Sequence, residues 1–264
     1  MEIILDAFSH SLQQFLSLFG LLLLGGLTLT LISRWTSRTF ESFIYPKFGL
    51  YVFGWIGVPF HEFSHAVFCK IFGHEIENVK WFDPRAKGGA VGAVTHSYDN
   101  HNPYHRVGHF FIGLGPTLLA PVALALLFCW LVPGARSFQP FVTNSLQGEI
   151  LAFSHALFRA VNFTSLGFYC FLYLAICISS QVELSREDLN QVKIGILPIL
   201  LILFFVNLIA CTFNWDWHRH IVNWGSKIMI FSGCLFALAV AIAMINLAIC
   251  YLLFSLLNFT KRKA

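Results

Sequence analysis

The chain has 264 residues, of which 57% are hydrophobic and only 11% are charged, and its formal net charge is +4. Soluble domains carry about 25% charged residues, so this composition is unlike that of a soluble domain and predicts an integral membrane protein in a lipid bilayer. The basic residues form no cluster interleaved with aromatic residues, so no nucleic-acid partner is expected.

A helix that crosses the hydrocarbon core needs about 20 apolar residues, and six stretches of the chain come close to that length. We therefore predict an all-α, polytopic membrane protein that forms a single domain over residues 1–264. The predicted spans are, in chain order, residues 15–32, 48–72, 107–131, 163–179, 194–213 and 228–253.

Two smaller elements are expected between these spans. Residues 77–82 and 88–98 have the composition of short strands, and the turn-forming residues 83–89 separate them, which predicts a small β-hairpin after the second span. Residues 141–163 mix polar and apolar side chains, as a helix lying in the membrane interface does.

The distribution of basic residues between the loops predicts the orientation, because Lys and Arg favour cytoplasmic loops. Six spans place both termini on one side of the membrane. That side also takes the loop with Lys80, Arg85, Lys87 and Arg106, together with the basic tail 261–263. We therefore expect cytoplasmic termini.

Three ionisable residues, His61, Glu62 and His65, lie inside the second predicted span, where ionisable side chains are functional by default. On a helix, residues four apart share a face, so both imidazoles can reach one metal ion, while Glu62 is offset by about 100°. This is the HExxH arrangement of zinc hydrolases, in which the glutamate acts as general base. Pro59 predicts a kink or a new helix start just before the motif.

A zinc site of this type needs a third protein ligand, and Asp188 is the candidate. If the six spans alternate in direction, Asp188 falls on the same side of the membrane as the end of the helix that carries His65. Ser185 and Asp188 also match the S-x-x-D pattern of a helix N-cap, so the sequence leaves both roles open.

With these residues in view, the stretch "VPFHEFSHAVF" resembles the site-2 protease family of membrane-embedded zinc metalloproteases. The short β-rich loop that follows, and the step Gly115–Pro116 in the next span, are similar to features of that family. The resemblance implies intramembrane proteolysis of a membrane-protein substrate, with Zn²⁺ as cofactor, His61, His65 and Asp188 as ligands and Glu62 as catalytic base. The family's Asp-Gly pair is absent, because Leu189 follows Asp188.

A second group of histidines allows other interpretations. His96, His105 and His109 can contact the substrate or the surroundings of the metal, or they can form a polar strip at the membrane interface. Because His101, His105 and His109 are spaced by four, as His61 and His65 are, these residues together are also similar to the histidine boxes of membrane di-iron desaturases and hydroxylases. In that interpretation, His218 and His220 add two further histidines. A third alternative is a non-catalytic, metal-binding membrane subunit that acts with partner subunits.

Overall fold

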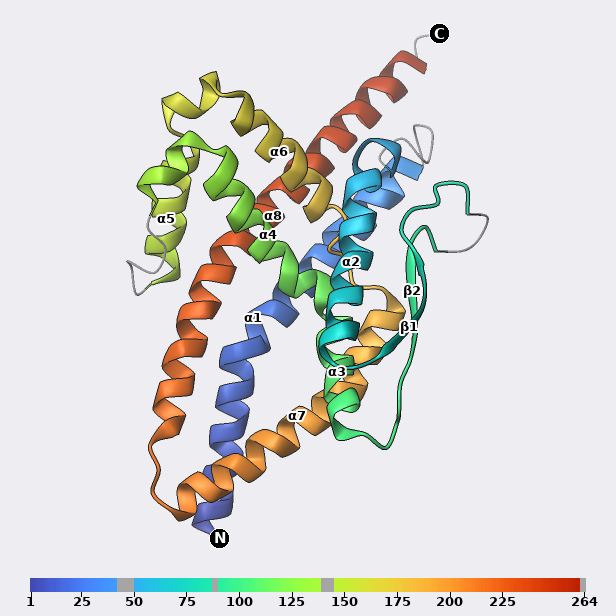
Figure 1. Ribbon diagram of the computed structural model, residues 1–264. Helices are drawn as coiled ribbons and strands as arrows, with labels where there is room; N and C mark the ends of the chain where they lie inside the picture. Colours follow the sequence, from blue (N-terminus) through green and yellow to red (C-terminus); the bar gives the residue numbers. More distant parts are fainter. Residues whose placement is uncertain (42–49, 87–89, 139–144, 262–264) are drawn as a thin grey trace.

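The computed structural model describes residues 1–41, 50–86, 90–138 and 145–261, and most of them are helical. The α-helices are α1 (Glu2–Glu41), α2 (Trp55–Ile71), α3 (Pro103–Gly113), α4 (Gly115–Leu131), α5 (Leu146–Leu157), α6 (Leu166–Ser179), α7 (Arg186–Thr212) and α8 (Trp217–Lys261). A single two-stranded sheet, formed by β1 (Glu75–Lys80) and β2 (Ala93–Ser97), completes this part of the chain (Figure 1).

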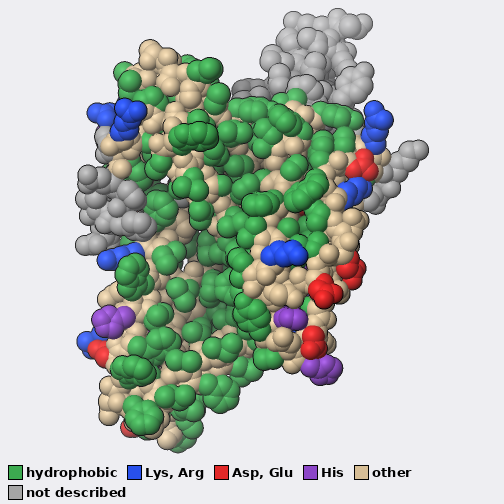
Figure 2. Space-filling model, viewed as in Figure 1, with side chains coloured by type: hydrophobic (Ala, Val, Ile, Leu, Met, Phe, Trp, Pro, Cys, Tyr) green, Lys and Arg blue, Asp and Glu red, His purple; other side chains and the backbone are tan. Residues whose placement is uncertain are grey.

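Among the residues that the structure describes, three helices are long and apolar enough to cross a membrane. They are α1 over Glu2–Ile32, α7, and α8 over Trp217–Ala241; α3 and α4 together make a fourth candidate, bent by 57° at their junction. The second and fourth predicted spans fall on the shorter helices α2 and α6, of 17 and 14 residues. Hydrophobic side chains cover most of the face in Figure 2, and the acidic side chains lie mainly along the margin that carries the hairpin.

The directions of the helices differ from the alternation that six spans require. A Cβ on Gly25 of α1 would touch Phe236 of α8, and one on Gly225 of α8 would touch Ser17, so α1 and α8 run parallel. In Figure 1, α6 runs down to the middle of the molecule, and α7 runs further down from there instead of turning back beside α6. The start of α1 and the end of α8 therefore lie at opposite ends of the molecule, which differs from the arrangement expected for six alternating spans.

The predicted hairpin is confirmed. Strands β1 and β2 pair in antiparallel register from Glu75 opposite Ser97 to Lys80 opposite Ala93, with an irregularity after Ile76. The first residues of the predicted second strand, 88 and 89, lie outside the described residues. The predicted interfacial segment contains α5, whose N-cap Ser145 accepts a hydrogen bond from Gly148; residues 141–144 also lie outside the described part.

Helices α3 and α7 pack so closely that glycines are required between them. A Cβ on Gly113 would lie 2.4 Å from the carbonyl oxygen of Asp188, and one on Gly195 would lie 2.3 Å from the backbone nitrogen of Phe110. Buried apolar side chains of α1, α3 and α7, together with Leu184, surround this contact: Phe15, Phe110, Leu114, Leu184, Val192 and Ile199. The close packing fixes the first turn of α7 against α3.

Candidate metal centre

Helix α2 brings the two histidines of the motif together. It begins at Trp55 after a π-helical turn, Leu50–Gly54, so the predicted break lies four residues before Pro59 rather than at it. The Nε2 atoms of His61 and His65 are 3.0 Å apart. The four-residue spacing therefore has the consequence predicted from the sequence, because both imidazoles project from one face of the helix.

Backbone carbonyls set the orientation of both rings. His61 Nδ1 lies 2.6 Å from the carbonyl oxygen of Gln181, and His65 Nδ1 lies 2.7 Å from that of Ile112. A carbonyl oxygen can only accept, so each Nδ1 carries the proton and each Nε2 presents a lone pair. Metal-binding histidines are held in this way.

Each of these carbonyls comes from a place where a helix ends. Ile112 lies in the last turn of α3, beside the bend into α4, and Gln181 lies two residues beyond the end of α6, next to its C-cap Ser180. The last carbonyls of a helix have no partner within it. The ends of α3 and α6 therefore supply the acceptors that orient the two imidazoles.

Asp188, in the first turn of α7, brings the third donor. Its Oδ1 lies 3.2 Å from His65 Nε2 and its Oδ2 lies 3.8 Å from His61 Nε2. His61, His65 and Asp188 form a group whose donor atoms all lie within 4.8 Å of one another, so the group can hold a metal ion. Two imidazoles and one carboxylate, with the fourth position left for water, fit the ligand set of a catalytic zinc site.

The N-cap interpretation of Asp188 holds as well. The Ser185 hydroxyl accepts a hydrogen bond from the Asp188 backbone nitrogen, and Asp188 Oδ2 accepts one, of 2.7 Å, from the Ser185 backbone nitrogen. The two roles therefore coexist, because the capping box fixes the carboxylate while Oδ1 faces the imidazoles. Asp188 was predicted as a ligand from the alternation of six spans, although the helices of the structure do not alternate in this way.

Glu62 is buried next to the group and lines a hollow of about 220 Å³ together with His61. The backbone just before β2 also lines this hollow and lies close to Glu62, because a Cβ on Gly92 would lie 2.7 Å from Glu62 Oε1. Gln181 and Ser185 line the same hollow. Glu62 thus lines a space beside the metal group that is large enough for water.

The loop histidines divide into two kinds. His101 precedes α3, is fully exposed and is not helical, because the helix begins at Pro103 with Asn102 as its N-cap. His96 and His109 instead gather around His74, a residue that the sequence analysis did not single out. His105 lies at the edge of this cluster, where its Nδ1 accepts a hydrogen bond from the backbone of Asp99.

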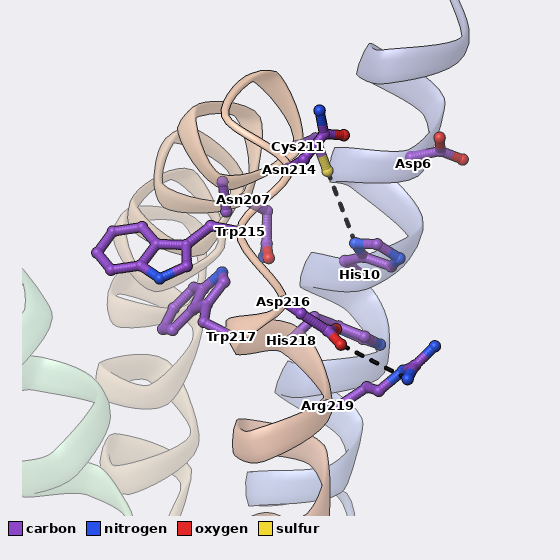
Figure 3. Close-up of a pocket in the computed structure, with 11 residues that line it drawn as sticks. Asp6, His10, Asn207, Cys211, Asn214, Trp215, Asp216, Trp217, His218 and Arg219 are labelled. Atoms are coloured by element: carbon purple, nitrogen blue, oxygen red, sulfur yellow. Dashed lines mark hydrogen bonds and ion pairs between the residues drawn. The ribbon is translucent and has the colours of Figure 1, made fainter.

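Another hollow, of about 370 Å³, lies at the opposite end of α7 (Figure 3). There the ring of His218 stacks on that of His10 at 3.9 Å, and Cys211 Sγ lies 3.7 Å from His10 Nδ1. Asp188 and Cys211 occupy the first and last turns of α7, about 35 Å apart at a rise of 1.5 Å per residue. The structure therefore does not bring His218 together with the histidines of the metal group.

No protein family, curated protein or solved structure matches this chain.

Proposed function

We propose that this chain is an intramembrane zinc metalloprotease that hydrolyses a peptide bond in or near the membrane segment of another membrane protein. One observation carries the proposal: His61, His65 and Asp188 can hold one ion, and Glu62 lines the hollow beside them. The resemblance of "VPFHEFSHAVF" to the site-2 protease family supports the same assignment.

The proposed roles follow from the chemistry of each group. Bound zinc lowers the pKa of a water molecule toward about 7 and polarises a carbonyl oxygen. His61 and His65 each bring an Nε2 lone pair, and Asp188 brings negative charge. Glu62 accepts a proton from the attacking water and returns it to the amide nitrogen as the C–N bond breaks.

The surroundings of the hollow favour an extended peptide as substrate. Helix α2 and the backbone at Gly92 both line it, and the backbone lies close to Glu62 because Gly92 has no side chain. An unwound membrane segment has free backbone donors and acceptors, which are costly in lipid. A site lined by backbone and by polar side chains such as Gln181 can satisfy them.

The variant Glu62→Gln tests the catalytic role. We expect it to retain zinc, because Glu62 is not a ligand, and to lose cleavage of a panel of single-span membrane proteins reconstituted with the full chain. Glu77→Gln, which changes an exposed carboxylate on β1, is the matched control and should retain cleavage. Unchanged cleavage by Glu62→Gln would exclude the mechanism, and a wild-type chain that binds zinc but cleaves nothing would favour a non-catalytic subunit.

A further inference from the structure

A second cluster of imidazoles lies near the metal group but shares no residue with it. His74 immediately precedes β1, His96 lies on β2, and His109 lies on α3. The ring centroids are 4.9 Å apart for His74 and His96, 5.1 Å for His74 and His109, and 6.0 Å for His96 and His109. Three separate segments of the chain therefore bring their histidines to one point.

The hydrogen bonds of His74 turn one of its ring nitrogens toward His96. Its Nε2 lies 3.0 Å from the carbonyl oxygen of His105 and must donate to it, so Nδ1 carries a lone pair. That Nδ1 lies 3.0 Å from Nδ1 of His96. A ring nitrogen bonded to a carbonyl, with the other nitrogen aimed at a second imidazole, is the arrangement of a metal-binding histidine.

His96 can adopt the same arrangement. Its Nε2 lies 3.5 Å from the amide nitrogen of Gln191, and the amide oxygen of Gln191 has no hydrogen-bond partner among the residues that the structure describes. A half-turn of this amide places the oxygen opposite His96 Nε2, which then donates to it. Both Nδ1 atoms, of His74 and of His96, then present lone pairs to the same point, where a cation stabilises them.

His109 is an independent sign of a ligand. Its side chain is only 2% exposed, and neither ring nitrogen has a partner within the described ranges. Buried polar atoms nearly always have a hydrogen-bond partner, and an exception requires an explanation such as a bound ion. Since no hydrogen bond fixes the ring, His109 can turn a nitrogen toward His74 and His96 without losing one.

We propose that His74, His96 and His109 form a second metal site, which takes a divalent transition ion such as Zn²⁺ through three neutral imidazoles. A zinc–imidazole bond of about 2.0–2.1 Å in tetrahedral geometry places ring centroids roughly 5 Å apart, close to the separations in this cluster. A donor set of nitrogen alone suits zinc, copper or nickel better than calcium or magnesium.

The electrostatics of the cluster support this assignment. Burial lowers the pKa of His74 and of His96 below the ordinary value for histidine. Burial thus favours the neutral form of imidazole, which is the form that a metal ion binds.

The two sites are neighbours on the same helices. His109 lies three residues before Ile112, whose carbonyl orients His65, and Gln191 lies three residues after Asp188. Each site thus uses α3 and α7, about one helical turn apart. The second site does not depend on proteolysis, because its evidence is the geometry of the cluster alone.

Metal content of the full chain in detergent tests the proposal. After equilibration with Zn²⁺ and removal of free metal, we expect two zinc ions per wild-type chain. We expect one in the double variant His61→Ala/His65→Ala and one in His96→Ala/His109→Ala. His101→Ala, which changes the exposed histidine of the same loop, is the control and should keep two.

X-ray absorption of the His61→Ala/His65→Ala chain identifies the remaining ligands. Because this chain retains every residue of the second cluster, its zinc should have a shell of about three imidazoles. No bound zinc in this folded variant, or a shell containing sulfur, would overturn the proposal. Two ions in the His96→Ala/His109→Ala chain would overturn it as well, since the second ion would then lie elsewhere.

Discussion

Asp188 has two roles in the structure, and a pair of substitutions separates them. One role is to face His65 Nε2 with Oδ1, and the other is to close the capping box with Ser185. Asp188→Asn keeps an oxygen that can accept from the Ser185 backbone nitrogen, but it removes the negative charge and replaces one oxygen by an amide. Ser185→Ala keeps the whole carboxylate and removes only the hydroxyl acceptor of the cap.

The two variants should differ strongly in metal affinity. Loss of a group that merely orients a metal ligand costs about 10–100-fold in affinity, so loss of a charged ligand should cost at least about 100-fold, or about 2.7 kcal/mol. We therefore expect Asp188→Asn to bind zinc at least 100-fold more weakly at the first site. Ser185→Ala should lose only about 1 kcal/mol of folding stability, the usual value of an N-cap.

Competition with a chelator of known affinity measures the zinc dissociation constant, and thermal unfolding in detergent measures the stability. Both variants are best prepared with His96 and His109 changed to alanine, so that only the first site is titrated. If Asp188→Asn binds zinc within about threefold of its parent, the third ligand is another residue. If Ser185→Ala weakens zinc as much as Asp188→Asn, the carboxylate acts only through the cap.

Three further changes test the packing around the site. Gly92→Ala would place a methyl group 2.7 Å from the flexible end of Glu62, so cleavage should fall at least about tenfold while zinc content stays constant. Gly195→Ala would place its methyl 2.3 Å from a backbone nitrogen of α3 and should lower the free energy of unfolding by about 1–3 kcal/mol. Thermal unfolding measures this loss, and Gly20→Ala is the control because its Cβ would meet nothing closer than 3.9 Å. Asn162→Ala removes a fully buried amide that forms hydrogen bonds with three backbone groups, so the free energy of unfolding should fall by at least about 1–3 kcal/mol. A melting temperature equal to that of wild type would contradict this expectation.

The local part of the site could be predicted from the sequence. The spacing of His61 and His65 requires only that the segment be helical, and the short strands beside the motif follow from residue types and turn signals. These two features depend on neighbours within a few residues, so the periodicity and composition of the sequence predict them. Asp188 was predicted from the alternation of six spans, which the structure does not have.

The directions of the helices could not be predicted in the same way. Composition gives the length of an apolar segment, but the 14 apolar residues of α6 do not show whether the next helix turns back or continues. His74 was missed for a related reason, because it lies beside no motif and joins His96 and His109 only through the tertiary fold. The carbonyls of Gln181 and Ile112 were also missed, since every residue has a backbone carbonyl and the sequence does not show which of them accepts from a histidine.

The ends of the broken helices and the buried histidines satisfy each other's hydrogen-bonding groups. In a membrane, a helix that ends inside the protein leaves carbonyl oxygens that need a donor, and an imidazole needs an acceptor that fixes its tautomer. His65 donates to a carbonyl at the end of α3, and His61 donates to one in the turn after α6. Each hydrogen bond therefore satisfies a buried carbonyl oxygen and fixes the tautomer of an imidazole. The same turn leads into α7, where Ser185 holds the carboxylate of Asp188. A continuous α6–α7 helix would offer neither the Gln181 carbonyl nor the N-terminal cap, so the metal group requires the chain to break where it does.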